Sequence, residues 1–267
     1  MQVVRFTISR NFLIALAFVF AALTRFGLGA SAQEVQVDTA LVVSVDVSNS
    51  VDAERYKLQL EGIAAALEDP SVVDAIVNGP NGGILFSMVM WADKPSIALP
   101  WTRITNKEEA KALAQRVRKI QNPGGEFTCM SRMLRSINDK IVPQIPAKAL
   151  RIVIDVSGDG PDNCNADESA ASVRDELVAN GVTVNGLPIL LGTPNAATDG
   201  VAPTTVEPTG AEPKHPLETW YRENVMGGSG SFVLPANGYG DFGRAIRQKF
   251  VIEISERATG THHAAID

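Results

Sequence analysis

The chain has 267 residues, of which 45% are hydrophobic and 20% are charged, and its formal net charge is −6. This length is enough to bury one sizeable hydrophobic core. The acidic balance argues against nucleic acid and anionic membrane surfaces as partners, because both are themselves negatively charged.

The first 32 residues have the pattern of an export signal. Arg5 and Arg10 form a positive start, an apolar run covers residues 12–23, and Ala30-Ser31-Ala32 supplies a small-residue cleavage pattern. An uncleaved anchor is the alternative, but the run is short for a spanning helix. Without residues 1–32 the formal net charge falls to −9, because that stretch holds three arginines and no acid. We therefore expect an exported protein, periplasmic or extracellular, whose mature chain has no membrane span.

Continuous apolar runs predict buried strands at four places. Such runs are typical of a parallel sheet that is covered on both faces. They lie at residues 40–45, 83–90, 151–156 and 182–191. A short edge strand is expected at residues 97–99, which are flanked by prolines, and a last strand at residues 231–234.

Apolar residues that recur with a 3.6-residue period predict helices between these strands. The stripes lie within residues 56–67, 110–120, 130–141, 170–177 and 242–250. Alternation of strands and helices predicts an α/β fold with right-handed crossovers. We expect a single Rossmann-like domain over residues 33–256. Its central sheet is mostly parallel, with one short antiparallel edge strand and helices on both faces.

One long segment, residues 192–215, is rich in Thr, Pro, Gly and Ala and has no apolar period. It leaves the carboxyl end of a predicted strand, where open α/β sheets bind ligands. A lid or selectivity loop and a surface insertion without a role are both compatible with this pattern. Residues 257–267 are predicted to form a disordered tail.

Three separate pieces of the chain place side-chain oxygens at the ends of predicted strands or helices. The first is Asp46-Val47-Ser48-Asn49-Ser50, which follows a buried strand and offers a carboxylate and two hydroxyls at alternate positions. The second is Thr128, and the third is Ser157-Gly158-Asp159-Gly160. Helix capping alone would account for Ser50 or for Thr128, and an ordinary turn would account for Asp159. Together they predict one oxygen-only site for a hard divalent cation.

This arrangement resembles the von Willebrand factor type A (vWA) superfamily over residues 37–254. The first piece matches the Asp-x-Ser-x-Ser signature, Thr128 matches the threonine of the second loop, and Asp159 matches the aspartate of the third. Within the superfamily the chain is similar to a group of exported bacterial proteins that have no assigned function. In one departure, Gly124-Gly125 is followed by Glu126-Phe127 before the threonine, which the family places directly after the glycine pair.

The resemblance implies a metal-ion-dependent adhesion site that holds magnesium or manganese, ahead of calcium. Its ligands, direct or through water, would be Asp46, Ser48, Ser50, Thr128 and Asp159. Glu126 is expected at the surface, with a place in the site as the alternative. Hydroxyl ligands add no negative charge, so two carboxylates neutralise a divalent cation only formally and it can accept one more oxygen.

These features predict a metal-dependent protein-binding module whose partner offers a carboxylate. A metal-dependent hydrolase such as a phosphatase is the alternative, but it needs a nucleophile or base nearby. In that class a second aspartate is expected where Ser48 stands. A scaffold that has the fold and binds no metal is a third possibility. No pattern indicates the oligomeric state.

The two cysteines and one acid in an apolar strand are expected to contact specific groups inside the fold. Cys129 and Cys164 predict a disulfide, because an even cysteine count in an exported protein favours pairing over free thiols. Asp155 lies inside an apolar strand, where an unpaired acid is costly. We expect a structural hydrogen bond to the backbone or to an arginine, with the orientation of a metal ligand as the alternative.

Overall fold

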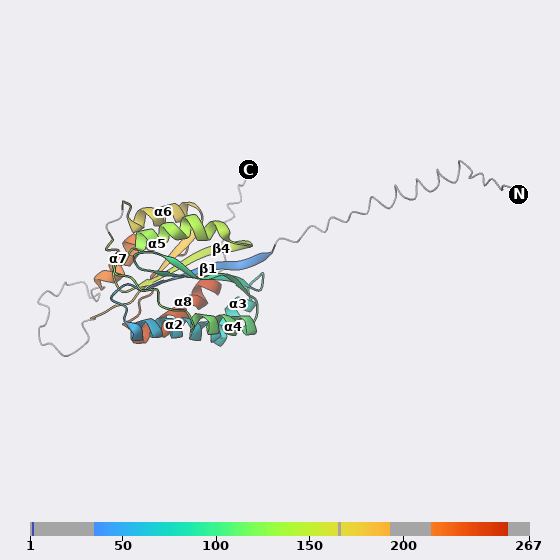
Figure 1. Cartoon of the computed structure of the whole chain (residues 1–267), viewed down its shortest axis with the longest axis horizontal. Coiled ribbons are helices and arrows are strands. Elements are labelled where there is room, and N and C mark those ends of the chain that lie inside the picture. Colours follow the sequence, from blue (N-terminus) through green and yellow to red (C-terminus); the bar gives the residue numbers. More distant parts are fainter. Residues whose placement is uncertain (1, 3–34, 165–166, 193–214, 256–267) are drawn as a thin grey trace, which may run out of the picture. The chain divides into compact units, whose positions relative to one another are not determined.

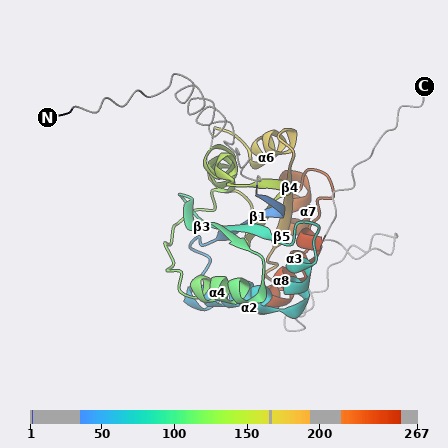
Figure 2. The same cartoon turned by 90° about the vertical axis from the view of Figure 1, so that its right-hand side faces the viewer.

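Five strands form one sheet, in the order β3-β2-β1-β4-β5 (Figures 1 and 2). The computed structural model describes residues 2, 35–164, 167–192 and 215–255. The strands are β1 (Gln36–Asp46), β2 (Ile84–Trp91), β3 (Ser96–Ile104), β4 (Lys148–Gly158) and β5 (Val182–Pro188).

The sheet is parallel except at one edge. β1 pairs in parallel with β2 and β4, and β4 pairs in parallel with β5, whereas the edge strand β3 runs antiparallel to β2. Every residue of β2 and β5 is buried, as continuous apolar runs require when both faces of a sheet are covered. The predicted α/β architecture is therefore confirmed.

Helices cover both faces of the sheet (Figure 1). One face packs against α2 (Ala53–Glu68), α3 (Pro70–Val77), α4 (Lys107–Val117) and α8 (Phe242–Ser255). The other packs against α5 (Met130–Ser136), α6 (Ala170–Ala179) and α7 (Pro216–Asn224). Short helical turns complete the described structure: η1 (Ile137–Ile141), η2 (Val142–Gln144) and η3 (Tyr239–Asp241).

Several predicted elements differ from the observed ones. The edge strand is nine residues long, and it accommodates Pro100 at a register irregularity, which an edge position tolerates because no central ladder is broken. The prediction of a last strand at residues 231–234 was wrong, because Val233 forms only an isolated bridge with Gly186. The helices α3 and α7 were not predicted, and each begins with a proline at its first turn.

The buried acid Asp155 pairs with a lysine rather than with an arginine. Its Oδ1 lies 3.4 Å from Nζ of Lys249 on α8, and that Nζ lies 2.9 Å from Oε1 of Glu253. Asn185 on β5 donates from Nδ2 to the same Glu253 oxygen at 2.8 Å. All four side chains are buried, so this cluster joins β4, β5 and α8 inside the core.

The predicted signal at residues 1–32 and the predicted tail at residues 257–267 lie outside the described residues. So does all but the ends of the long segment, residues 192–215. Within the described part of the chain, no helix has the length and apolar character needed to cross a membrane.

Candidate metal site

The three predicted pieces meet at the carboxyl edge of the sheet. β1 ends at Asp46, and its neighbour β4 ends at Gly158, one residue before Asp159. The parallel register pairs Val45 with Ser157, so both strands end at the same level. Because parallel strands carry their loops at a common edge, this register brings together residues that are more than a hundred positions apart.

A chain of hydrogen bonds joins the hydroxyl groups of the site to one carboxylate. Thr128 Oγ1 donates to Ser48 Oγ at 3.3 Å, the hydroxyls of Ser48 and Ser50 lie 3.2 Å apart, and Ser50 Oγ donates to Asp159 Oδ1 at 2.8 Å. Asp46 Oδ1 accepts the backbone N–H of Ser48 at 2.8 Å. All five sequence-predicted residues therefore lie in one cluster.

Neither Ser50 nor Thr128 acts as a helix cap. The N-cap of α2 is Asp52, which accepts the N–H of Arg55, and the N-cap of α5 is Cys129, which makes no side-chain capping bond. Capping, which could have explained each hydroxyl separately, is therefore wrong for both. Their hydroxyls point instead into the cluster that contains Ser48 and Asp159.

Asp46 has an oxygen that no described protein group satisfies. Its side chain is completely buried, and Oδ2 has no hydrogen-bond partner among the described residues. Burial raises the pKa of Asp46 to about 7, against the lowering effect of hydrogen bonds from Ser48, and the nearby Asp159 charge raises it further. A buried carboxylate in this setting is stabilised by a proton or by a cation.

A tyrosine hydroxyl and the Asp46 carboxylate both lie next to Gly158. A Cβ placed on Gly158 would lie 2.9 Å from both Asp46 Oδ2 and the hydroxyl oxygen of Tyr221. Tyr221 is fully buried on α7, and its hydroxyl also has no hydrogen-bond partner within the described chain. The glycine of the third loop is therefore required for close packing around Asp46.

Tyr239 and Arg55 also contact residues of the cluster. The Tyr239 hydroxyl donates to Asp159 Oδ2 at 3.0 Å. Arg55 lies over the Tyr239 ring, 5.3 Å from its centroid, and donates from Nη1 to the Ser50 carbonyl at 2.6 Å. Sequence reasoning missed Tyr221, Tyr239 and Arg55, because none belongs to the Asp-x-Ser-x-Ser motif and no spacing links them to it.

The two residues inserted before Thr128 are held by Asp93. Its carboxylate accepts the backbone N–H of Glu126 at 2.7 Å and that of Phe127 at 3.1 Å. The side chain of Glu126 is exposed, as expected. The insertion therefore changes the path of the second loop while Thr128 still contacts Ser48.

The second and third loops are fastened to each other. The N–H of Thr128 donates to Asn163 Oδ1 at 2.7 Å, and the N–H of Asn163 donates to the Thr128 carbonyl at 3.1 Å. The structure also joins Cys129 and Cys164 in the predicted disulfide, with their Cα atoms 4.9 Å apart. These contacts fix Thr128 relative to the loop that carries Asp159.

The donor set fits a hard divalent cation. It consists of carboxylate and hydroxyl oxygens, which are the ligands that magnesium and manganese prefer, and one oxygen of the Asp46 carboxylate is unsatisfied within the described chain. No group of three or more His, Cys, Asp or Glu side chains able to hold a metal occurs among the described residues. The candidate metal site therefore consists of hydroxyl oxygens and only two carboxylates.

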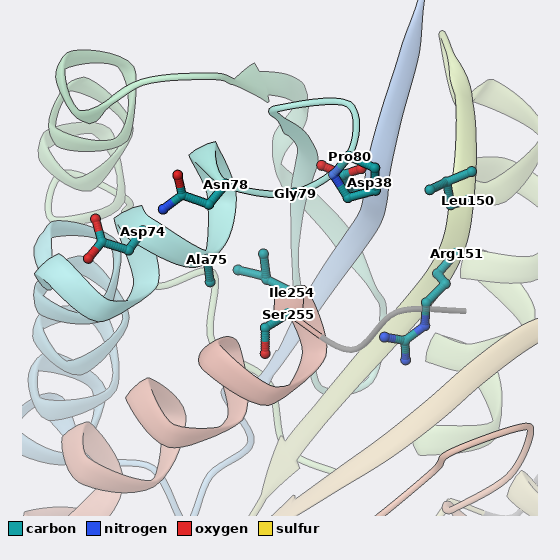
Figure 3. Close-up of a pocket in the computed structure, with 10 residues that line it drawn as sticks. All are labelled: Asp38, Asp74, Ala75, Asn78, Gly79, Pro80, Leu150, Arg151, Ile254 and Ser255. Atoms are coloured by element: carbon teal, nitrogen blue, oxygen red, sulfur yellow. The ribbon is translucent and has the colours of Figure 1, made fainter. Parts of the chain in front are cut away.

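A separate pocket of about 440 Å³ lies at the other end of the strands (Figure 3). It is lined by residues of β1, α3 and the turn after it, β4 and α8, including Asp38 and Arg151. The Asp38 carboxylate already accepts the backbone N–H of Asn81 at 2.8 Å and its side-chain amide at 3.1 Å. This pocket contains none of the predicted metal ligands.

Solved structures of other proteins have a similar fold. A structure of proximal thread matrix protein 1 from the mussel byssus has a TM-score of 0.57 and 13% identity, covering 83% of this chain and 49% of that chain. Another, described as having a zinc-occupied MIDAS motif, has a TM-score of 0.56, 18% identity and the same coverages. A von Willebrand factor type A structure from Catenulispora acidiphila has a TM-score of 0.53 and 14% identity, covering 82% and 43%.

The fold thus resembles that of a solved von Willebrand factor type A structure, as the sequence resemblance implied. This chain spans about half the length of these solved chains. Over residues 36–258 it matches the family described as "Protein of unknown function (DUF1194)", and it belongs to that family. No curated protein matches the chain.

Proposed function

We propose that this chain is an exported, metal-ion-dependent protein-binding module. One observation carries the proposal: the buried Asp46 Oδ2 has no protein partner within the described chain, while Oδ1 of the same carboxylate accepts from Ser48, whose hydroxyl belongs to the chain of oxygens that ends on Asp159. The solved mussel structure with a zinc-occupied MIDAS motif supports the idea of a cation at such a cluster. We expect magnesium or manganese here because the donors are all oxygens.

In this proposal Asp46, Ser48, Ser50, Thr128 and Asp159 would hold the cation, directly or through water. The bound cation would supply an electrophilic position for one oxygen from outside the chain, and a partner carboxylate suits that position. The protein's own groups prepare the site. Tyr239 orients Asp159 through its hydrogen bond, and Arg55 holds the Ser50 carbonyl.

The hydrolase alternative has weaker support. His215 lies near Asp159 in a pocket beside the site, but its Nδ1 already accepts the N–H of Leu217 at the start of α7. If the alternative is correct, the protein should hydrolyse a generic phosphoester in the presence of magnesium, and Asp46→Asn should abolish this activity. The binding proposal expects no metal-dependent turnover.

The direct test is a pull-down from the native cell envelope with immobilised protein. We expect a partner that is retained with magnesium, released by EDTA, and not retained by Asp46→Ala. Glu54→Gln is the matched control, because Glu54 is an exposed acid in the first turn of α2. A partner that binds equally well in EDTA, or equally well to Asp46→Ala, would count against the proposal.

A further inference from the structure

An apolar pocket lies beside the candidate metal site and shares Asp159 with it. The pocket has a volume of about 370 Å³. Its other lining residues include Pro161 from the third loop, Leu191 after β5, His215, and Leu217 and Trp220 on α7. The residue whose carboxylate accepts from Ser50 and Tyr239 therefore also borders an apolar space.

Part of the apolar lining is exposed, and its tryptophan packs against a buried tyrosine. Leu191 is 38% exposed and Trp220 is partly exposed. The Trp220 ring packs edge-on against Tyr221, with centroids 5.7 Å apart, and its carbonyl accepts from Asn224 Nδ2 at 3.0 Å. Exposed apolar groups gathered at a site often mark a contact surface, and tryptophan is common at the centres of such contacts.

We propose that this pocket binds a large apolar side chain of the same partner segment whose carboxylate is held at the metal site. The partner would thus carry an acidic residue with an aromatic or large aliphatic residue within two positions of it. This inference rests on the proposed function and adds the chemistry of the partner.

Charge and size together favour this occupant. A cation held by the two carboxylates and the hydroxyls would attract one anionic oxygen, whereas the neighbouring pocket is lined mainly by apolar side chains and so favours an uncharged apolar group. The volume is near the lower end for ligand pockets, which run from roughly 300 to 1,000 Å³. Such a space suits one large side chain. The candidate metal site and the pocket share Asp159. Because consecutive Cα atoms of a peptide are about 3.8 Å apart, residues one or two positions apart can occupy both.

Short capped peptides can test the inference, using Gly-Asp-Trp-Gly and Gly-Asp-Gly-Trp-Gly as probes. Matched peptides replace the tryptophan by alanine or the aspartate by asparagine. Binding to ¹⁵N-labelled protein is followed by NMR, with magnesium and with EDTA. We expect the better tryptophan peptide to bind about tenfold more tightly than its alanine counterpart, because burial of an aromatic side chain adds to the metal contact.

Two protein variants locate the effect. Trp220→Ala and Leu191→Ala should each reduce the advantage of the tryptophan peptide while the metal-dependent binding of the alanine peptide remains. Leu58→Ala is the control, because Leu58 on α2 is 39% exposed and matches Leu191 in size and exposure. If Trp220→Ala fails to fold, Leu191→Ala still decides the question.

The possible outcomes separate this inference from the proposed function. Equal metal-dependent binding of the tryptophan and alanine peptides, or equal effects of Leu191→Ala and Leu58→Ala, would overturn the inference and leave the function standing. Concentration-dependent self-association that Leu191→Ala removes would assign the pocket to a second copy and also overturn it. If no aspartate peptide binds with magnesium, the proposed function itself is contradicted, together with this inference.

Discussion

Asp46 and Gly158 depend on each other at the scale of single residues. Asp46 is buried at the end of β1, and the chain must pass Gly158 close to its carboxylate to bring Asp159 to the same cluster. A side chain on Gly158 would collide with Asp46 and with the Tyr221 hydroxyl. Asp46, the acid that we assign to metal binding, therefore fits only because Gly158 has no Cβ.

Gly158→Ala should destabilise the protein by about 1–3 kcal/mol, the usual cost of overpacking a closely packed site. The added Cβ would lie 2.9 Å from two oxygens that are themselves buried. Urea denaturation of the two proteins measures the difference. Gly160→Ala is the control, because its Cβ would meet Thr128 Oγ1 only at 4.0 Å. Equal stability of both variants would show that residue 158 has room for a Cβ beside Asp46 and Tyr221.

The sequence could identify only some residues of the site. Asp46, Ser48 and Ser50 belong to a short motif at a strand end, so their alternate spacing was readable from the chain. Tyr221 and Tyr239 were not predictable, because the packing of α7 and η3 alone brings the Tyr221 hydroxyl near Asp46 and lets the Tyr239 hydroxyl donate to Asp159. Long-range packing of single side chains leaves no periodic pattern in a sequence.

At the scale of elements, the second and third loops act as one fastened unit. Reciprocal hydrogen bonds link Thr128 and Asn163, and the Cys129–Cys164 disulfide lies directly beside them. Ser131, in the first turn of α5, also donates its N–H to Asp162 Oδ2 at 2.8 Å. The start of α5 is thereby tied to the loop that carries Asp159.

Replacing both cysteines by serine should lower the free energy of unfolding by about 2–4 kcal/mol, the typical contribution of a disulfide. The bridge closes a loop with a sequence separation of 35. Urea denaturation with and without reductant gives the comparison. Reductant should weaken the wild type and have no effect on the double variant. An unchanged midpoint on reduction of the wild type would contradict a stabilising role for the disulfide.

Element prediction succeeded where the pattern was long and failed where it was short. Buried strands were readable because both of their faces are apolar. The helix α3 has only eight residues, and α7 has nine, so each spans little more than two turns and gives only a short amphipathic pattern. β3 was predicted too short, because Pro100 suggested an end where an edge strand tolerates an irregularity.

At the scale of the whole molecule, a buried charged cluster joins the sheet to the last described helix. Two acids, Asp155 and Glu253, share one lysine, Lys249, in the core. Burial, reinforced by the Glu253 charge and opposed by Lys249, raises the pKa of Asp155 to about 8. A proton on Asp155 makes the cluster neutral, which is the favourable state for buried groups.

This pKa shift predicts a pH dependence of stability. The folded protein holds a proton on Asp155 that the unfolded chain releases near pH 4, so stability should fall as pH rises toward 8. Its steepest possible contribution is about 1.4 kcal/mol per pH unit. Asp155→Asn keeps the shape without the titration and should make this fall shallower in urea denaturation between pH 5 and pH 8, leaving the part due to Asp46, whose pKa is also raised. Parallel curves for the two proteins would contradict a protonated Asp155.

The central claim is that the loops around Asp46 bind a divalent cation, and thermal unfolding with magnesium, manganese or zinc tests it most directly. A ligand at about a hundred times its Kd stabilises the folded state by about 2.7 kcal/mol, so we predict that magnesium or manganese raises the Tm by several degrees. The shift should be lost in Asp46→Ala and retained in Glu54→Gln. A melting temperature that millimolar metal leaves unchanged, or that rises equally in Asp46→Ala, would contradict the account.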